Sequence, residues 1–256
     1  MGKIITVSNQ KGGVGKTTTA FNVAAGLTNK GKKVLLVDLD PQANLSDYLG
    51  FEGGDVPTIS NLIAETASKS IISKETVSSA IIHNDVINAD YIPSDINLAN
   101  AELFMINAIS RETVLKRILH SVVDEYDYII IDCLPSLGVL LINALTAANE
   151  VLIPVQTQKF SVDGLENLLN VFEQIKATVN PSLELAGILP TMVDNTKISR
   201  SAYEMLLEKY GEKVFDVTVH RSVDAAKSSE AKKSISASSK LGADYTALVE
   251  EILSNE

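Results

Sequence analysis

A glycine-rich loop lies between a short apolar run and a helix-forming stretch near the start of the chain. The apolar run is Ile4 to Val7, and the loop reads Lys11-Gly12-Gly13-Val14-Gly15-Lys16-Thr17-Thr18. Glycines in such a turn let successive backbone N–H groups point at one phosphate, and the N-terminus of the following helix adds positive potential. The order of strand, loop and helix therefore predicts a phosphate-binding loop in an α/β protein.

The side chains of this loop fit the other parts of a bound nucleotide. Lys16 is expected to reach the β- and γ-phosphates, and the hydroxyl of Thr17 to bind the Mg²⁺ that bridges them. Thr18 opens the helix and completes the cradle. The strict pattern for such loops begins with glycine, but Gln10 stands at that position and Lys11 follows it. From the residues alone, Lys11 is either a solvated loop lysine or a second functional lysine.

Three carboxylates follow other apolar runs directly. Asp38 and Asp40 come after one run and Asp132 after another. Ligands of open α/β sheets bind at the carboxyl ends of the strands, so we expect these side chains to gather beside the loop. Asp132 is expected to hold Mg²⁺, directly or through water. The alternative role for Asp132 is to cap a helix that begins near Leu137.

Short apolar runs alternate with helix-forming stretches along the rest of the chain. Continuous β-branched runs of this kind are typical of strands buried on both faces of a parallel sheet. We therefore predict an α/β fold, doubly wound, with a mostly parallel sheet and helices on both faces. One domain is expected over residues 1–256, without an N-terminal helix-turn-helix domain. The expected strands are 4–7, 34–37, 128–131, 151–155 and 185–189, and the expected helices are 16–29, 111–123, 137–148, 161–179, 198–209 and 239–253.

Three further segments carry local signals. Gly31 is a candidate C-cap of the first helix. Residues 50–100 show weak periodicity broken by glycine and proline, which indicates small helices and a strand near Tyr91. Serine is dense between Ser228 and Ser239, which predicts a flexible loop before the last helix.

The loop and the first two carboxylates together carry a family resemblance. The pattern K-G-G-x-G-K-T-T is the deviant Walker A motif, and the chain resembles the family of ParA-type partition ATPases, MinD-type ATPases and nitrogenase iron proteins. The segment Val37 to Gln42, V-D-x-D-P-Q, is similar to the second signature of the ParA type. The resemblance implies that Lys11 reaches the nucleotide of a partner subunit, so that ATP lies between two subunits and homodimerisation depends on ATP. It also implies that Asp40 orients or deprotonates the attacking water and that Asp38 supports the metal and the loop.

The resemblance extends through Asp132 to Gly138 and continues in the spacing of later strands and helices. By analogy, Thr191 and Met192 are expected to contact the adenine, although an ordinary strand terminus is the alternative. Two positions depart from the family pattern. Leu134 stands where a proline is frequent, and Gln158 stands where a glutamate is common. Neither belongs to the phosphate-binding residues, so the departures bear on the stiffness of the loops and on partner contacts.

Composition narrows the class of protein. The chain has 256 residues, 45% of them hydrophobic and 21% charged, as in ordinary globular proteins. Cys133 is its single cysteine, which excludes an internal disulfide and indicates a packing role. The iron-protein branch of the family needs two cysteines per subunit, so the resemblance to that branch is set aside. The sequence shows no membrane-spanning run and no secretory signal, and we expect a cytoplasmic protein.

The remaining branches differ in what the ATP-bound dimer attaches to. The ParA type implies nonspecific binding to double-stranded DNA, association with the nucleoid, and slow hydrolysis that a ParB-like centromere-binding protein stimulates. The MinD type implies membrane attachment through a basic C-terminal helix, but residues 247–256 are acidic, so no membrane contact is expected. A metabolic or metal-inserting P-loop protein is a third class, for which extra cysteines or a substrate domain are the expected signs.

Charge distribution leaves room for DNA binding. The net charge is −10, which disfavours nucleic acid, but residues 221–240 carry five basic and two acidic residues. Each basic side chain is either a DNA contact or a solvated surface charge. The candidates for DNA contact are Lys197, Arg200, Arg221, Lys227, Lys232 and Lys233.

Overall fold

The computed structural model describes residues 2–157 and 162–255. A sheet of seven strands runs through its centre in the order β3-β4-β2-β5-β1-β6-β7. All neighbouring strands are parallel except the pair β3 and β4, which is antiparallel. The prediction of a mostly parallel, doubly wound α/β sheet is confirmed. The strands are β1 (Lys3–Val7), β2 (Val34–Leu39), β3 (Ile82–Asn84), β4 (Ala89–Ile92), β5 (Tyr128–Cys133), β6 (Glu150–Gln156) and β7 (Glu184–Thr191).

The central strands are buried on both faces, which explains their uninterrupted apolar sequences. Every residue of β2 and β5 is buried. Successive side chains of a strand point to opposite faces, so one strand feeds two cores. In β5, Ile129 and Ile131 belong to one hydrophobic cluster and Ile130 to the other. The two clusters are separated by the sheet.

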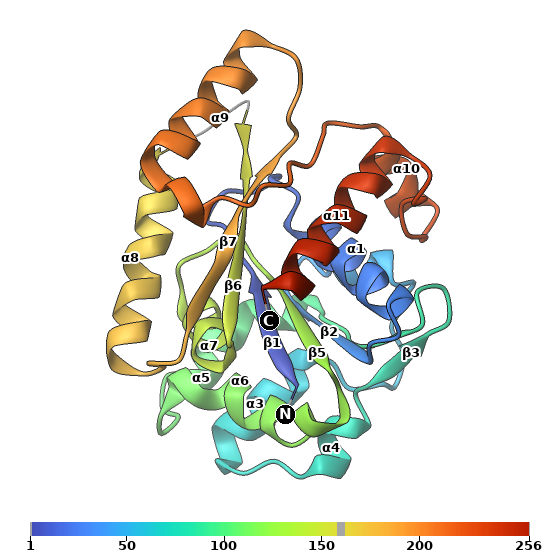
Figure 1. Cartoon of the computed structure of the whole chain (residues 1–256). Coiled ribbons are helices and arrows are strands. Elements are labelled where there is room, and N and C mark those ends of the chain that lie inside the picture. The colour runs from blue at the N-terminus through green and yellow to red at the C-terminus, as the bar shows by residue number, and fades with distance from the viewer. Residues whose placement is uncertain (1, 158–161, 256) are drawn as a thin grey trace.

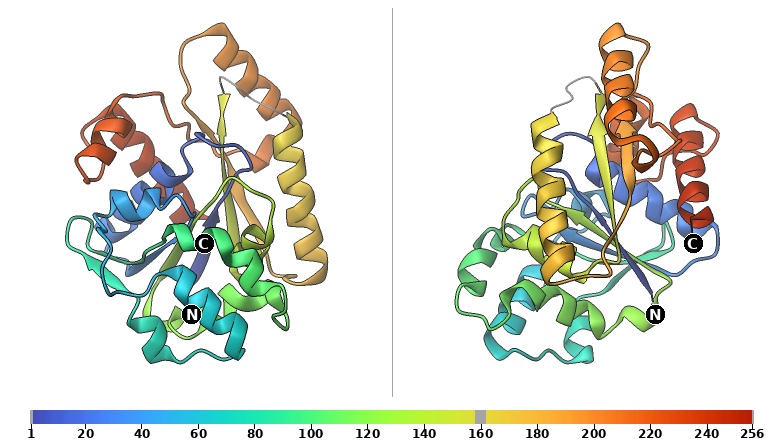
Figure 2. Two further views of the ribbon diagram at one scale, coloured as in Figure 1. Left: turned by 180° about the vertical axis from the view of Figure 1, so that it is seen from behind. Right: turned by 60° about the vertical axis from the view of Figure 1, so that its left-hand side comes forward.

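Helices cover both faces of the sheet (Figures 1 and 2). One face packs against α3 (Ile59–Lys69), α5 (Ala101–Met105), α6 (Val114–His120), α7 (Val139–Ala147) and α8 (Val162–Thr178). The other face packs against α1 (Lys16–Asn29), α2 (Asn44–Tyr48) and α11 (Lys240–Ser254). The remaining elements are α4 (Lys74–Ser78), α9 (Lys197–Tyr210), α10 (Asp224–Glu230), η1 (Ile96–Asn100), η2 (Arg111–Thr113), η3 (Val123–Glu125) and η5 (Gly211–Lys213).

Most predicted helices are present, and two expectations are wrong in detail. The first helix spans Lys16–Asn29 as predicted, and Gly31 follows it with φ +80°, the left-handed conformation of a C-cap glycine. The single helix expected over 111–123 is divided into η2, α6 and η3. The flexible loop expected from Ser228 is also wrong at its start. Ser228 lies in α10 and its buried hydroxyl is hydrogen-bonded to that of Tyr48.

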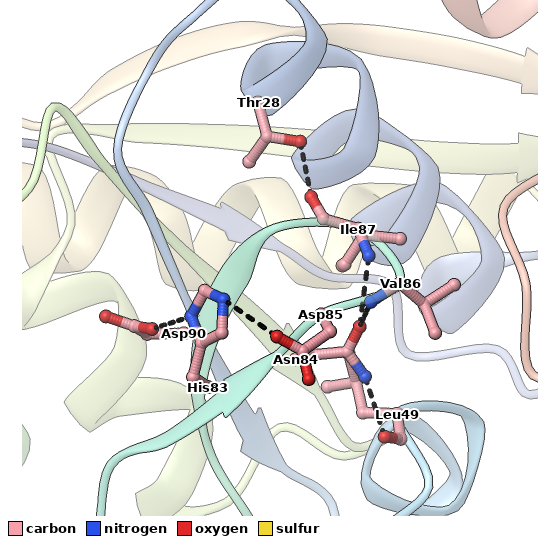
Figure 3. A network of polar contacts seen from close by, with 8 residues as sticks. All are labelled: Thr28, Leu49, His83, Asn84, Asp85, Val86, Ile87 and Asp90. Carbon is pink, nitrogen blue, oxygen red and sulfur yellow. Dashed lines mark hydrogen bonds and ion pairs between the residues drawn. The ribbon is translucent and has the colours of Figure 1, made fainter.

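The hairpin of β3 and β4 is held by a set of paired polar groups, which we call the hairpin network (Figure 3). Asn84 Oδ1 accepts hydrogen bonds from the backbone N–H groups of residues 86 and 87, and its Nδ2 donates to a carbonyl oxygen after α2. Thr28 Oγ1 donates to the Ile87 carbonyl at 2.6 Å. His83 Nδ1 lies 2.7 Å from one oxygen of Asp90, and the hydroxyl of Tyr126 donates to the other at 2.8 Å. The network fastens the sheet edge to α1 and to the segment after α2.

Within residues 2–157 and 162–255, no helix combines the length and the apolar character that crossing a membrane requires.

Candidate nucleotide site

The loop between β1 and α1 has the backbone geometry of a phosphate cradle. Gly13 and Gly15 have φ +71° and +91°, backbone conformations that residues other than glycine rarely adopt. A Cβ built at either position meets no atom within 4 Å, so the space in front of the loop is open. Gly15 is the N-cap of α1 and no side chain caps this helix. The first N–H groups of α1 therefore face the open side of the loop without a capping side chain.

Buried polar contacts fasten the loop to the ends of neighbouring strands. Asn9 donates from Nδ2 to the Pro154 carbonyl in β6 at 2.7 Å, and its Oδ1 accepts from the Lys11 N–H at 2.9 Å. Thr191, the last residue of β7, donates from its hydroxyl to the Val14 carbonyl at 2.8 Å. The two side chains fix both halves of the loop. The contacts of Asn9 were not predicted, since their only signal in the sequence is a polar residue just after the β1 run.

Lys16 is almost fully buried at the base of the loop. The residue is 7% exposed, and its Nζ donates to the Lys11 carbonyl at 3.1 Å. Burial lowers the pKa of Lys16, and the carboxylate of Asp132 opposes that shift. An ammonium has three N–H donors, and the bond to the Lys11 carbonyl uses one of them. The buried ammonium of Lys16 is therefore suited to donate to phosphate oxygens.

Asp132, near the end of β5, is a buried carboxylate. The residue is 1% exposed, and neither Oδ1 nor Oδ2 has a partner among the described residues. Burial raises the pKa of Asp132 well above its ordinary value and the nearby Asp38 raises it further, while Thr17 and Lys16 act in the opposite direction. The helix-cap alternative for Asp132 is wrong, because α7 begins at Val139 and its N-cap is Gly138.

An unpaired buried carboxylate beside a threonine hydroxyl fits a magnesium site. Among the residues that the structure describes, no group of three His, Cys, Asp or Glu side chains is arranged to hold a metal on its own. Mg²⁺ is usually held by only one or two carboxylates, with phosphate oxygens and waters completing its octahedron. Asp132 and Thr17 therefore suit a metal that arrives with a nucleotide.

Asp38 and Asp40 lie at the end of the adjacent strand. Asp38 is paired in register with Asp132 across β2 and β5. Its Oδ2 accepts from the N–H and the hydroxyl of Ser46 at 2.8 and 2.7 Å, and its Oδ1 accepts from the Asp40 N–H at 3.1 Å. Burial raises the pKa of Asp38 to about 6, against the effect of the Ser46 hydrogen bonds. Asp40 is half-buried, and its Oδ1 accepts from the Gln42 N–H at 2.9 Å.

A cavity of about 460 Å³ opens in front of the loop. Asp40 and Met192 line it together with the loop, so the structure brings these predicted site residues to one cavity. Asp38, Asp132 and Thr191 lie behind that surface as buried residues. The contact of Thr191 with adenine stays a prediction, and its hydroxyl is directed to the loop. The cavity is lined by Gly12, Gly13, Gly15, Lys16, Thr17, Thr18, Asp40, Gln42, Asn44, Asp47, Tyr48, Pro135, Met192 and Ser229.

The predicted DNA-contact residues form two groups. Val193 and His220 form a parallel bridge, which sets the start of α9 beside the segment that contains Arg221. Lys197, Arg200 and Arg221 are exposed there. The second group, on α10 and the turn after it, contains Lys227, Lys232 and Lys233. Lys227 and Lys233 are exposed, whereas Lys232 is half-buried and its Nζ lies 3.7 Å from Asp47 Oδ1 at the nucleotide cavity. DNA contact by either group stays a prediction.

The two departures from the family pattern have different outcomes. Leu134 is half-buried against the core and lines a small cavity together with Pro41, so it joins the loop after β5 to the loop after β2. Gln158 lies outside the described residues. The packing role expected for Cys133 agrees with its burial at the end of β5, where burial also raises the pKa of its thiol.

Comparison with known proteins assigns the family. A model of the AAA domain matches residues 2–185. The sporulation initiation inhibitor protein Soj of Bacillus subtilis is 41% identical over 225 residues, which cover 87% of this chain and 86% of Soj. The chain belongs to the ParA/Soj family of ATPases.

Solved structures of similar proteins contain nucleotide. This ParA/Soj-family chain superimposes on a cobyrinic acid a,c-diamide synthase from Mycobacterium smegmatis with bound ATP analog and magnesium, at a TM-score of 0.86, with 32% identity and coverage of 99% and 94% of the two chains. A putative plasmid partition protein from Borrelia burgdorferi bound to AMPPNP gives a TM-score of 0.80 with 28% identity and covers 100% and 99%. The fold is therefore one that holds ATP analogs in these relatives.

Proposed function

We propose that this protein is a Mg²⁺-dependent ATPase of DNA partition, which hydrolyses ATP to ADP and phosphate. The observation that carries the proposal is Asp132, a buried carboxylate without a hydrogen-bond partner among the described residues, placed behind a phosphate loop whose cavity Asp40 lines. A buried unpaired charge is costly, and a metal bound with ATP removes that cost. Membership of the ParA/Soj family of ATPases supports the same function.

The chain's own residues supply binding and positioning. The N–H groups of the loop and Lys16 hold the phosphates, and Thr17 with Asp132 holds the metal. When bound, Mg²⁺ would neutralise charge on the phosphate oxygens. Asp40 orients the attacking water and takes its proton, while Asp38 holds the Asp40 backbone in place. Catalysis of this kind is positioning and charge stabilisation, so turnover without a stimulating partner is slow.

In our proposal the working unit is an ATP-dependent homodimer. Lys11 completes the site of the other subunit, ATP binding closes the dimer, and hydrolysis opens it. The ATP-bound dimer binds double-stranded DNA without sequence preference, and a ParB-like centromere-binding protein accelerates hydrolysis. The cycle moves plasmid or chromosomal DNA, in the cytoplasm and on the nucleoid. Exposed Lys197, Arg200 and Arg221 support a DNA-binding surface.

The packing of α11 argues against the membrane-attached alternative. Its apolar residues, including Tyr245, Leu248 and Val249, are buried in the core shared with α1. Val249 Cγ2 lies 2.6 Å from a Cβ built on Gly26, so the two helices approach closely. A helix that binds a membrane surface needs an exposed apolar face, and the apolar face of α11 is buried in the core.

The similarity to the synthase concerns the fold and the bound nucleotide, and a shared fold alone does not show a shared activity.

A retention assay tests the proposal. Wild type with Mg²⁺ and ATP is expected to retain random duplex DNA, with affinity falling steeply as salt rises. Asp40→Ala is expected to retain ATP and DNA while phosphate release falls to background. Retention of anionic vesicles instead of DNA would favour the membrane alternative. Undiminished phosphate release by Asp40→Ala would remove Asp40 from its role.

A further inference from the structure

Ser46 joins three segments at the end of the sheet. The residue lies in α2 and is 1% exposed. Its N–H and its hydroxyl both donate to Asp38 Oδ2, at 2.8 and 2.7 Å. Its Oγ also accepts from the Ser94 N–H at 2.8 Å, just beyond β4. One hydroxyl therefore connects α2, the end of β2 and the chain after β4.

The contacts continue from Asp38 to the Asp40 backbone. Two donors from Ser46 fix one carboxylate oxygen of Asp38, so the other oxygen is held toward the Asp40 N–H at 3.1 Å. Asp40 is the next link and lines the nucleotide cavity. Ser46 itself does not line that cavity, although its neighbours Asp47 and Tyr48 do.

We propose that Ser46 is a positioning residue for ATP hydrolysis, acting through Asp38 on Asp40. The inference rests on the proposed function of Asp40. Loss of the hydroxyl removes one of the donors to Asp38 and leaves the buried Ser94 N–H without its acceptor. The Asp40 carboxylate then loses its fixed place, and a displacement of about 1 Å at a water-positioning group costs on the order of 100-fold in rate. The phosphate loop is not part of this chain of contacts, so affinity for ATP is unchanged.

The structure offers two matched controls. Ser60 is a buried serine of α3 whose hydroxyl donates to Asp95 Oδ1 at 2.7 Å, so Ser60→Ala removes the same type of bond elsewhere. Ser94→Ala removes a buried hydroxyl beside Ser46 that has no partner in the part of the chain that the structure describes, and it keeps the N–H that donates to Ser46. Neither control touches the nucleotide cavity.

The test compares kcat and KM for ATP in wild type, Ser46→Ala, Ser46→Thr and both controls, with hydrogen exchange of the Asp40 amide. We expect Ser46→Ala to lower kcat by about 100-fold at unchanged KM, and to speed exchange at Asp40. Ser46→Thr keeps the hydroxyl and is expected to restore most of kcat. Ser60→Ala and Ser94→Ala should keep the wild-type kcat.

The outcomes separate the two proposals. If wild type does not release phosphate from ATP, the proposed function fails. If wild type is active and Ser46→Ala matches Ser60→Ala in kcat and in Asp40 exchange, the inference about Ser46 is overturned. If Ser46→Ala does not fold, Ser46→Cys, which keeps the shape of the side chain in a slightly larger form with a weaker donor, decides in its place. A wild-type kcat in that variant would also overturn the inference.

Discussion

The nucleotide site and the hairpin network differ in how completely their polar groups are paired. In the hairpin network, both polar atoms of the Asn84 side chain have partners (Figure 3), and so do both carboxylate oxygens of Asp90. In the nucleotide site, neither carboxylate oxygen of Asp132 has a hydrogen-bond partner within the described residues, and Lys16 Nζ donates to a loop carbonyl. Both regions lie along the same sheet and have similar residue types. Paired polar groups stabilise the fold, whereas unpaired polar groups beside a cavity are available to bind a ligand.

Removal of Lys16 is the strongest test of this contrast. Lys16→Ala takes away the only buried ammonium that the nucleotide site presents within the described residues, and we expect hydrolysis to fall by about 1,000-fold. Lys30→Ala is the matched control, because Lys30 pairs on the surface with Glu250 at 2.8 Å. Phosphate release measures both. Equal activity in the two variants would break the contrast.

The pH dependence of stability is the next test. Because burial raises the pKa of Asp38 to about 6, the folded protein keeps a proton that the unfolded chain loses near pH 4. The stability that this residue contributes is full below about pH 4 and is lost as the pH rises through 6, by about 3 kcal/mol. Urea unfolding of nucleotide-free protein should show a shallower fall over this window in Asp38→Asn. An unchanged slope would contradict the raised pKa.

Neutral replacements in the two regions should have opposite signs. Asp132→Asn removes an unpaired buried charge and is expected to stabilise the nucleotide-free protein by about 2 kcal/mol, more at pH 8 than at pH 5. Asp90→Asn disturbs a paired carboxylate and is expected to destabilise by about 1 kcal/mol. Urea unfolding in EDTA gives both values. The same sign for both would refute the comparison.

The smallest effect belongs to the hairpin network. Thr28→Val removes the hydroxyl that donates to the Ile87 carbonyl and is expected to cost about 1 kcal/mol of stability. Phosphate release from ATP should stay at the wild-type rate, because Thr28 lies at the far end of α1 from the loop. Thermal unfolding and an ATPase assay measure the two quantities. Loss of activity in a folded Thr28→Val would place function in the hairpin network.

Local patterns predicted most of the sheet and the nucleotide loop. The strands with continuous apolar runs, the helix from Lys16 and the carboxylates at the strand ends all depend on neighbouring residues, so the sequence contains their signal. β3 carried none, because a strand of three residues that is not fully buried has no clear periodicity. α10 was not predicted, because serines favour loops over helices and the hydrogen bond between Ser228 and the distant Tyr48 cannot be read from the sequence.

The supporting contacts of the site were beyond sequence reasoning. Thr191 meets Val14 across a separation of 177 residues, and Asn9 meets Pro154 across 145. Ser46 gains its role only because β4 returns beside β2 and brings the Ser94 N–H to it. Such contacts depend on the finished topology. The residues that we propose to bind a nucleotide are readable from motifs, while the residues that hold them in place are not.

Sedimentation of the Asp40→Ala variant with Mg²⁺ and ATP tests the central claim most directly, because this variant is expected to bind ATP without consuming it. We expect a dimer with ATP, a monomer without nucleotide, and a monomer with ATP once Lys11→Ala is added. A dimer that forms equally well in the Lys11→Ala, Asp40→Ala double variant would contradict the claim that two subunits complete one ATP site.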